Sequence, residues 1–467
     1  MTAKATPISM PAWLGALQGE ARRAATLNRH ILAGHVASTT FSRELVRALA
    51  LVPDPGSFNP VEAKQAVTLL GLLGAGALRH DQERRDTFDQ DPGWLLDIMR
   101  VGNGSYTFRE YLGAVADRTG TGHTDRDTFA SLVRWNVPTA TVRWEGQPVL
   151  ELPGVFGDNS TRTYTDDPND PGAPNPSEVA FFELLKLCEA LEAYANQQLM
   201  QLVSGKLTPA SPEGLEAAYR TATMLDGIRA LMAAYMRLKG KRALKPRHFM
   251  DVVRQFAPHW SQGDIPTTGA QDPESMKRVK ILGIAYPGYN HGIVRLFPSL
   301  LEHERAEIEA LLNNQPLLDV LLEATGVSLA ELAHYTPAQK HAFLSDHPEI
   351  AAGCQIMVAD GRLALVHNQL TQTYLFNPQR QREADEDIRA AAEGRPPVSI
   401  DARVVSNYSG TSKMLEPHLT ALAMARQDPT GLLRALGMSV AAISTAAGVR
   451  PYPNTNKSYA SLVTLGD

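Results

Sequence analysis

His367 lies in a segment whose residues favour a helix, and its imidazole could bind a metal. The segment "VHNQLTQTYLFNP" spans residues 366–378. At helical spacing, His367, Leu370 and Tyr374 share one face. A neutral imidazole on a helix can serve as the axial ligand of heme iron, whereas the alternative is a core histidine with satisfied hydrogen bonds. The spacing alone leaves both interpretations open.

A cationic group with apolar neighbours lies in "LKPRHFMDVVRQFAPHW", residues 244–260. Arg254 is a candidate anchor for a substrate carboxylate, because a guanidinium held on a helix binds a carboxylate through two hydrogen bonds. A surface salt bridge is the alternative. On a continuous helix Arg254 lies one turn after Met250, so both would line one wall of a pocket. Phe249 is expected to pack in the core, with contact to an aromatic substrate as the alternative.

Two polar stretches, 261–275 and 377–410, are predicted loops, and long loops in a compact protein often close over a binding site. Gly410 and Thr411 end the second stretch. The Thr411 hydroxyl and nearby backbone N–H groups are candidates to bind a substrate carboxylate or ammonium after closure. The alternative is an N-cap of the predicted helix 412–426, and both roles are compatible.

The elements that must position these residues are mostly helices. Apolar residues recur at helical spacing through most of the chain, and alternating strand patterns are scarce. The best strand pattern is 139–152, a predicted hairpin around Glu145 and Gly146. The predicted helices are 12–29, 41–52, 62–80, 108–117, 178–204, 213–238, 246–257, 276–284, 291–312, 315–324, 337–345, 360–376 and 412–426. We therefore predict a mainly α fold.

Composition divides the chain into four parts. Residues 158–177 are rich in Asp, Asn, Pro and Gly, which is typical of a linker. This linker separates a smaller N-terminal domain, 1–157, from a helical domain, 178–440. The N-terminal domain is expected to cover the pocket. Residues 441–467 are polar and contain prolines, which indicates a tail on the surface.

The bulk composition is that of a folded soluble protein. Of 467 residues, 43% are hydrophobic and 20% charged, and a net charge of −5 gives no basic footprint for nucleic acid. Cys188 and Cys354 are too few for a disulfide framework and are expected to be buried in a protein of the reducing cytoplasm. The first residues lack the continuous apolar stretch of a signal peptide, so we expect no export signal. The apolar run 66–78 is shorter than the roughly 20 residues of a bilayer span, so it predicts a buried helix.

Common catalytic motifs are missing, but five segments carry another signal. The sequence has no HExxH, GxSxG, Walker loop or paired CxxC, which argues against hydrolase, phosphoryl-transfer and structural-zinc functions. The five segments contain His367, Gln369, Tyr374 and Pro378; Pro246, Phe249, Arg254 and Trp260; and residues 181–195, 289–301 and 408–419. In their order along the chain, these segments resemble the indoleamine 2,3-dioxygenase superfamily of heme proteins, over roughly residues 140 to 425.

The resemblance implies a helical heme-binding domain with a smaller N-terminal domain. Heme b would be bound by His367 as the iron ligand, with Leu370 and Tyr374 beside it. The substrate would meet Phe249, Met250, Arg254, Gly410 and Thr411. The implied reaction inserts dioxygen into the indole ring of tryptophan or a related indole or aromatic amine. The implied partners are that small molecule and dioxygen, with no nucleic acid and no membrane.

Departures from the family pattern keep two alternatives open. Met250 replaces an aromatic residue, Leu185 occupies the place of a serine, and Arg362 is the nearest arginine before the histidine. These changes concern the substrate more than the heme. One alternative is therefore a heme enzyme that rearranges or oxygenates a modified tryptophan, as in the pyrrolnitrin-biosynthesis branch of the superfamily. The other is a helical binding protein without heme, in which His367 belongs to the core.

Overall fold

The computed structural model describes residues 11–50, 52–85, 94–102, 104–122, 128–256, 271–284, 289–397, 431–451 and 459–466. These parts are mainly helical with a few small sheets, which confirms the predicted fold class at that level. Trp260, Gly410, Thr411 and the predicted helix 412–426 lie outside the described residues.

The N-terminal helices enclose a hydrophobic core of their own. The elements are α1 (Ala12–Leu32), α2 (Thr39–Leu49), η1 (Pro55–Ser57), α3 (Pro60–Arg85), α4 (Trp94–Ile98), β1 (Arg100–Val101), β2 (Tyr106–Thr107), α5 (Phe108–Asp117) and the π-helix η2 (Ala130–Trp135). Helix α3 contacts α1, α2, α4, α5 and η2. It is long and apolar enough to cross a membrane, but 78% of its most apolar window is buried inside the protein. The prediction of a buried helix at 66–78 is confirmed.

A three-stranded sheet joins the hairpin to the end of the chain. Strands β3 (Ala140–Trp144) and β4 (Gln147–Leu152) pair antiparallel, and β7 (Val463–Leu465) pairs with the other edge of β3. Glu145 and Gly146 have φ values of 52° and 81°, the left-handed backbone that a tight hairpin turn requires. The predicted hairpin is confirmed.

The predicted linker and the predicted tail both contain regular structure. Residues 158–177 include β5 (Asp166–Asp167) and β6 (Asp170–Pro174), and the Asp166 carboxylate accepts from the Arg29 guanidinium of α1 at 2.5 Å. Residues 441–467 include most of α19 (Val440–Ala446) and all of β7, whose Val463 is buried. The prediction of a surface tail is therefore wrong for α19 and β7. Their apolar side chains, such as Ile443 and Val463, are buried in the core although the composition of 441–467 is polar. The domain boundaries themselves stay a prediction.

The larger part of the protein is built on α6, α7 and α15, which pack side by side. Its elements are α6 (Pro176–Val203), α7 (Pro212–Tyr235), η3 (Gly240–Arg242), α8 (Pro246–Asp251), η4 (Val253–Phe256), α9 (Pro273–Leu282), α10 (Tyr289–Leu296), η6 (Phe297–Ser299), α11 (Glu302–Leu311), α12 (Leu317–Thr325), α13 (Leu329–His334), α14 (Pro337–Asp346), α15 (Pro348–Thr371), the π-helix η7 (Gln372–Phe376), α16 (Asn377–Glu393), α18 (Leu432–Leu436) and η10 (Tyr459–Ser461). Asn175 and Ser211 cap α6 and α7 through their side chains, and a proline follows each cap.

The prediction of a loop at 377–410 is wrong for its first half. Helix α16 covers Asn377–Glu393 and ends at Gly394, whose φ is 65°. Its sequence is strongly polar, which suggested a loop, but Gln, Arg, Glu and Ala are strong helix formers. Side-chain hydrogen bonds at i,i+4 from Gln379 to Glu383 and from Gln381 to Asp385 support it.

Two hydrophobic clusters meet at one short segment. The N-terminal cluster includes Val252 and Phe256, whereas the larger cluster includes Phe249, Met250 and Val253. These five residues alternate between the two cores because α8 ends at Asp251 and a separate turn, η4, begins at Val253. The predicted single helix 246–257 is therefore two short helices, and they lie where the two cores join.

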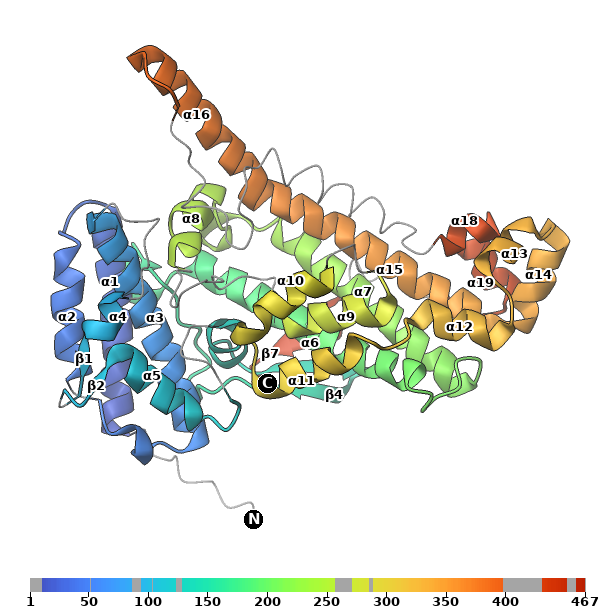
Figure 1. Cartoon of the computed structure of the whole chain (residues 1–467), viewed down its shortest axis with the longest axis horizontal. Helices are drawn as coiled ribbons and strands as arrows, with labels where there is room; N and C mark the ends of the chain where they lie inside the picture. Colours follow the sequence, from blue (N-terminus) through green and yellow to red (C-terminus); the bar gives the residue numbers. More distant parts are fainter. Residues whose placement is uncertain are drawn as a thin grey trace.

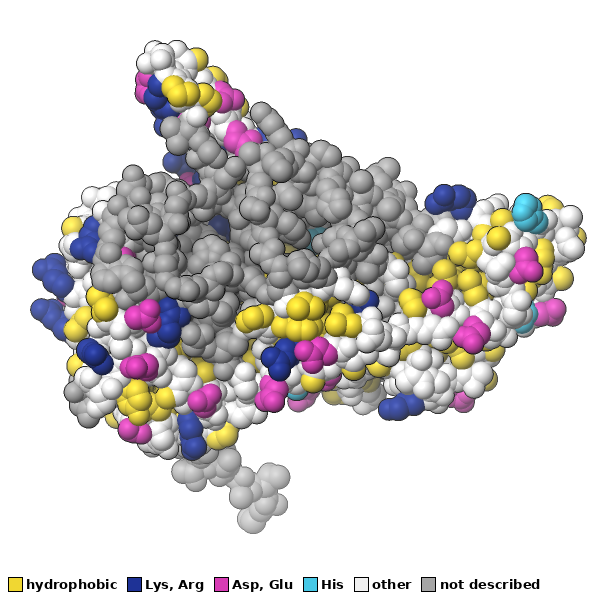
Figure 2. All heavy atoms as spheres, viewed as in Figure 1, with side chains coloured by type: hydrophobic (Ala, Val, Ile, Leu, Met, Phe, Trp, Pro, Cys, Tyr) yellow, Lys and Arg dark blue, Asp and Glu magenta, His cyan; other side chains and the backbone are white. Residues whose placement is uncertain are grey.

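The arrangement is elongated. Figure 1 shows the N-terminal helices at one end, α12, α13, α14, α18 and α19 at the other, and α15 along the length between them. Helix α15 continues through η7 into α16, which projects from the body (Figure 1). In the same view, Figure 2 shows Lys and Arg interspersed with Asp and Glu over the described N-terminal helices, without a continuous basic stripe on this face.

Candidate functional site

His367 lies near the C-terminal end of α15 with its side chain exposed. Leu370 beside it is half-buried. The Thr371 hydroxyl donates a hydrogen bond of 2.9 Å to the His367 carbonyl oxygen, so this turn is braced by its own side chain. The structure therefore does not place His367 in the core, which was the alternative to a ligand role.

A π-helical turn separates His367 from Tyr374. The i→i+4 ladder of α15 ends at Thr371, and η7 continues the chain with wider turns over Gln372–Phe376. Wider turns change which residues share a face, so Tyr374 is buried although His367 is exposed. The expectation that the two side chains share one face holds only for a regular helix. Such turns occur often at functional sites.

Helix α8 is held in place from three sides. Pro246 begins it, and the His248 Nε2 atom lies 2.8 Å from the buried Glu178 carboxylate at the start of α6. Asp251, its last residue, forms an ion pair with Arg382 of α16. Helix α8 also contacts η7 directly. Two segments that are far apart in the sequence, each a candidate site by itself, are thereby brought together.

Four aromatic rings form the contact between these segments. They belong to Phe181 of α6, Tyr235 of α7, Phe249 of α8 and Tyr374 of η7, and we call them the aromatic group. Phe249 meets Phe181 at a centroid distance of 5.3 Å and Tyr374 at 5.9 Å, both edge to face. These distances and angles are favourable for aromatic pairs. The predicted packing role of Phe249 and of Tyr374 therefore has a specific set of partners.

Arg254 lies on η4, five residues after Phe249 of the aromatic group. This segment is where the two hydrophobic cores meet. The Arg254 side chain is half-buried, and desolvation lowers the pKa of its guanidinium to about 10. Met250, in contrast, is fully buried. Met250 and Arg254 belong to different helices, because α8 ends at Asp251 and η4 begins at Val253. Helical spacing therefore no longer predicts that the two side chains line the same wall of a pocket. A guanidinium can bind a carboxylate through two hydrogen bonds, so Arg254 stays a candidate for that role.

Few side chains in the described part of the chain could hold a metal or a cofactor. Among the described residues, no three His, Cys, Asp or Glu side chains cluster in a way that could hold a metal ion. A heme would need one protein donor, and the exposed His367 imidazole is the candidate that the sequence indicates. Cys188 and Cys354 are buried, as predicted, and form no disulfide, and burial raises the pKa of Cys188.

Gly410 and Thr411, predicted to bind the substrate, lie outside the described residues. For the other predicted site residues, the structure brings Phe249 and Tyr374 together and places His367 and Arg254 on the elements that flank them. No family model matches the chain, and no curated protein matches it. The chemistry of the site is therefore the basis for any functional assignment.

A buried charge network supports the site and was missed in the sequence. Arg134 of η2 binds both Glu189 of α6 and Glu304 of α11. Arg278 of α9 binds both Glu192 of α6 and Asp360 of α15. Glu189 and Glu192 lie three residues apart on the otherwise apolar helix α6. Two acidic residues at that spacing in an apolar helix were the sequence signal that could have predicted buried ion pairs. We call these ion pairs the α6 charge network; it ties the N-terminal part to the helices that carry His367.

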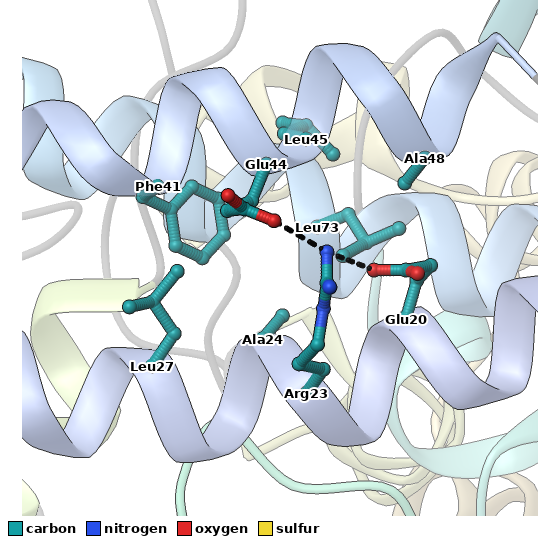
Figure 3. Close-up of a pocket in the computed structure, with 9 residues that line it drawn as sticks. All are labelled: Glu20, Arg23, Ala24, Leu27, Phe41, Glu44, Leu45, Ala48 and Leu73. Atoms are coloured by element: carbon teal, nitrogen blue, oxygen red, sulfur yellow. Dashed lines mark hydrogen bonds and ion pairs between the residues drawn. The ribbon is translucent and has the colours of Figure 1, made fainter.

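A small surface pocket lies elsewhere. It is found between α1 and α2, and none of the predicted site residues lines it (Figure 3). Arg23 spans its mouth with ion pairs to Glu20 at 2.9 Å and Glu44 at 2.7 Å (Figure 3). The pocket is thus bordered by a satisfied surface network rather than by groups available for a ligand.

Proposed function

We propose that the protein is a heme-dependent oxygenase that acts on tryptophan or a related indole or aromatic amine. The observation that carries this proposal is the contact between Phe249 and Tyr374, which joins the helix before Arg254 to the helix after His367. The contact joins the segment that carries Arg254 to the segment that carries His367, next to the place where the two hydrophobic cores meet. Junctions of this kind are common binding places.

The residues divide the work of binding. His367 would hold heme b through its imidazole, with Leu370 and Tyr374 against the macrocycle. Arg254 would bind the substrate carboxylate through its guanidinium, and Phe249 would contact the aromatic ring, while Gly410 and Thr411 would close over it. When bound, heme activates dioxygen, which the electron-rich indole then accepts across its C2–C3 bond. Both oxygen atoms end in the product, so the reaction consumes no external reductant.

The finer fold assignment belongs to the same proposal. The helical part, with α6, α7 and α15 at its centre, would be the heme domain of indoleamine 2,3-dioxygenase type, and the N-terminal helices would be its smaller cover. A cytoplasmic location is part of the proposal as well.

The test begins with an absorption spectrum of the purified protein supplemented with hemin. A Soret band, shifted by carbon monoxide after dithionite reduction in the manner of histidine-bound heme, is expected for the wild type. L-tryptophan and substituted indoles are then supplied with dioxygen, and we expect one dioxygen consumed per product without added reductant. Heme binding with a different oxygen stoichiometry would support the rearranging branch instead. Failure of the wild type to bind hemin would contradict the proposal.

A further inference from the structure

Helix α16 leaves the body of the protein and projects away from it (Figure 1). It contacts η7 and α8, and Arg382 near its start forms the ion pair with Asp251 of α8. In proteins most of the stability of a helix comes from packing one of its faces against a partner. The side of α16 that faces away from the body is therefore where a further partner would add stability.

That side of α16 carries an apolar stripe. Glu386 and Ala390 are buried and lie on one side of the helix. The outer stripe lies on the opposite side at helical spacing, and its four members are all exposed: Ala384, Ile388, Ala391 and Ala392. Ile388 is 70% exposed, more than any other large hydrophobic side chain in the described part of the chain. Figure 2 shows hydrophobic side chains among charged ones where α16 projects.

The charges beside the outer stripe indicate which partner fits it. Asp385 and Arg389 lie one turn apart on the same flank of the stripe, and both are exposed. Within the chain, Asp385 accepts from the Gln381 amide at 2.8 Å, and Arg389 lies 3.4 Å from Glu386. In a parallel pair of α16 helices each charge would face its own kind. In an antiparallel pair, Asp385 of each helix faces Arg389 of the other, as flanking charges do in paired helices.

The same antiparallel register brings the two outer stripes together. Its two-fold axis lies at the level of residue 387, midway between Asp385 and Arg389. Ile388 of one helix is then two residues, or about 3 Å along the axis, from both Ile388 and Ala384 of the other. The small alanine side chains let the two helices approach closely. On the opposite flank Asp387 lies beside its own copy, a like-charge contact that weakens the pair.

We propose that the outer face of α16 is the interface of an antiparallel dimer of this protein. The outer stripes of the two copies pack together, and Asp385 and Arg389 form two reciprocal ion pairs at their edge. One pair of helices is a small interface, so the dimer is weak and its population depends on protein concentration. The dimer requires no heme, so this proposal and the proposed function succeed or fail independently.

Sedimentation velocity of the full chain over a range of concentrations tests the proposal. Wild type is expected to dimerise as its concentration rises. Ile388→Glu is expected to raise the Kd of the dimer at least about tenfold, because it removes apolar contact and buries a charge. Ile98→Glu, at an isoleucine of α4 that is 55% exposed, is the matched control and should dimerise like wild type. A wild type that stays monomeric throughout, or an Ile388→Glu protein that dimerises as tightly, would overturn the proposal.

Two charge reversals test the antiparallel register. Asp385→Arg and Arg389→Asp should each raise the Kd about tenfold or more, because like charges then face each other. Mixed in equal amounts, the two variants should form a heterodimer as tight as the wild-type dimer, since one presents only arginines and the other only aspartates. A mixture that stays monomeric, although circular dichroism shows both variants folded, would overturn the pairing. Asp387→Asn should lower the Kd, because it removes the like-charge contact; a higher Kd would contradict this register.

Discussion

The rings of Phe249 and Tyr374 meet edge to face with their centroids 5.9 Å apart. Phe249 belongs to a helix that ends two residues before η4, and Tyr374 to the π-helical turn that follows α15. Arg254 follows Phe249 by five residues and His367 precedes Tyr374 by seven, so the contact joins the two segments that carry the cation and the imidazole. Changes at either end of this pair test whether the region binds a ligand.

Replacing the exposed imidazole should abolish heme binding without unfolding the protein. His367→Ala is expected to lose the Soret band, because no other described group stands in the same position. Its free energy of unfolding should change by less than about 0.5 kcal/mol, as for other exposed side chains. His341→Ala, at another exposed histidine, is the control and should keep the band. A His367→Ala protein with an unchanged heme spectrum would exclude this residue as the ligand.

Replacing the desolvated guanidinium should affect substrates that carry a carboxylate. Arg254→Gln is expected to keep heme but to raise the Kd for L-tryptophan at least about tenfold, since a charge-assisted pair is lost. Binding of tryptamine, which has no carboxylate, should change little. Spectral titration of the heme-loaded protein measures both constants. An equal loss for the two compounds would show that Arg254 acts on the fold and not on the carboxylate.

Breaking the α6 charge network should be costly. Arg134→Met leaves Glu189 and Glu304 buried without their cation, and we expect a loss of about 3–5 kcal/mol in the free energy of unfolding. Arg23→Met, which removes an exposed arginine that also binds two glutamates, should cost no more than about 1 kcal/mol. Urea unfolding of the two variants measures the difference. Similar midpoints would mean that the buried network contributes no more than a surface one.

Stability should respond to pH through Asp272, which caps α9 by accepting from the Glu274 N–H at 3.0 Å. Desolvation, and then Glu192 and Glu189, raise the pKa of Asp272 well above its ordinary value. The folded protein therefore holds this proton more tightly than the unfolded chain. The resulting stabilisation is complete below the ordinary pKa of aspartate and is lost as pH rises through the raised value.

Asp272→Asn keeps the cap and removes the charge. It is expected to be more stable than wild type by about 1–2 kcal/mol at pH 8, with the gain shrinking toward pH 4. Asp158→Asn is a control in which we expect the opposite effect. Burial acts to raise the pKa of Asp158, but the nearby Arg162 outweighs burial and lowers it. This variant should therefore be less stable than wild type at pH 8. Thermal melts across this pH range report both. A gain for Asp272→Asn that is independent of pH would contradict the assignment.

Local patterns predicted much of the fold. The hairpin was visible because Glu145 and Gly146 sit between two alternating runs, and the helix at 108–117 was predicted with the bounds that the structure gives. The break at Val252 was not predicted, because the apolar spacing of 246–257 continues across it. Helix α16 was missed because its residues are polar, although their helix propensity is high.

The sequence by itself determined that the protein is mainly helical, that 66–78 is a buried helix, and that His367, Phe249, Arg254 and Tyr374 belong to helical segments. These are local properties, set by side-chain spacing and by the capping residues at helix ends. Only the tertiary structure decided that His367 is exposed while Tyr374 is buried, that α8 meets η7, and that Tyr235 joins their aromatic contact. Those facts depend on a π-helical turn and on packing between segments far apart in the chain. No local pattern encodes them, because their free energy comes from partners that only folding brings together.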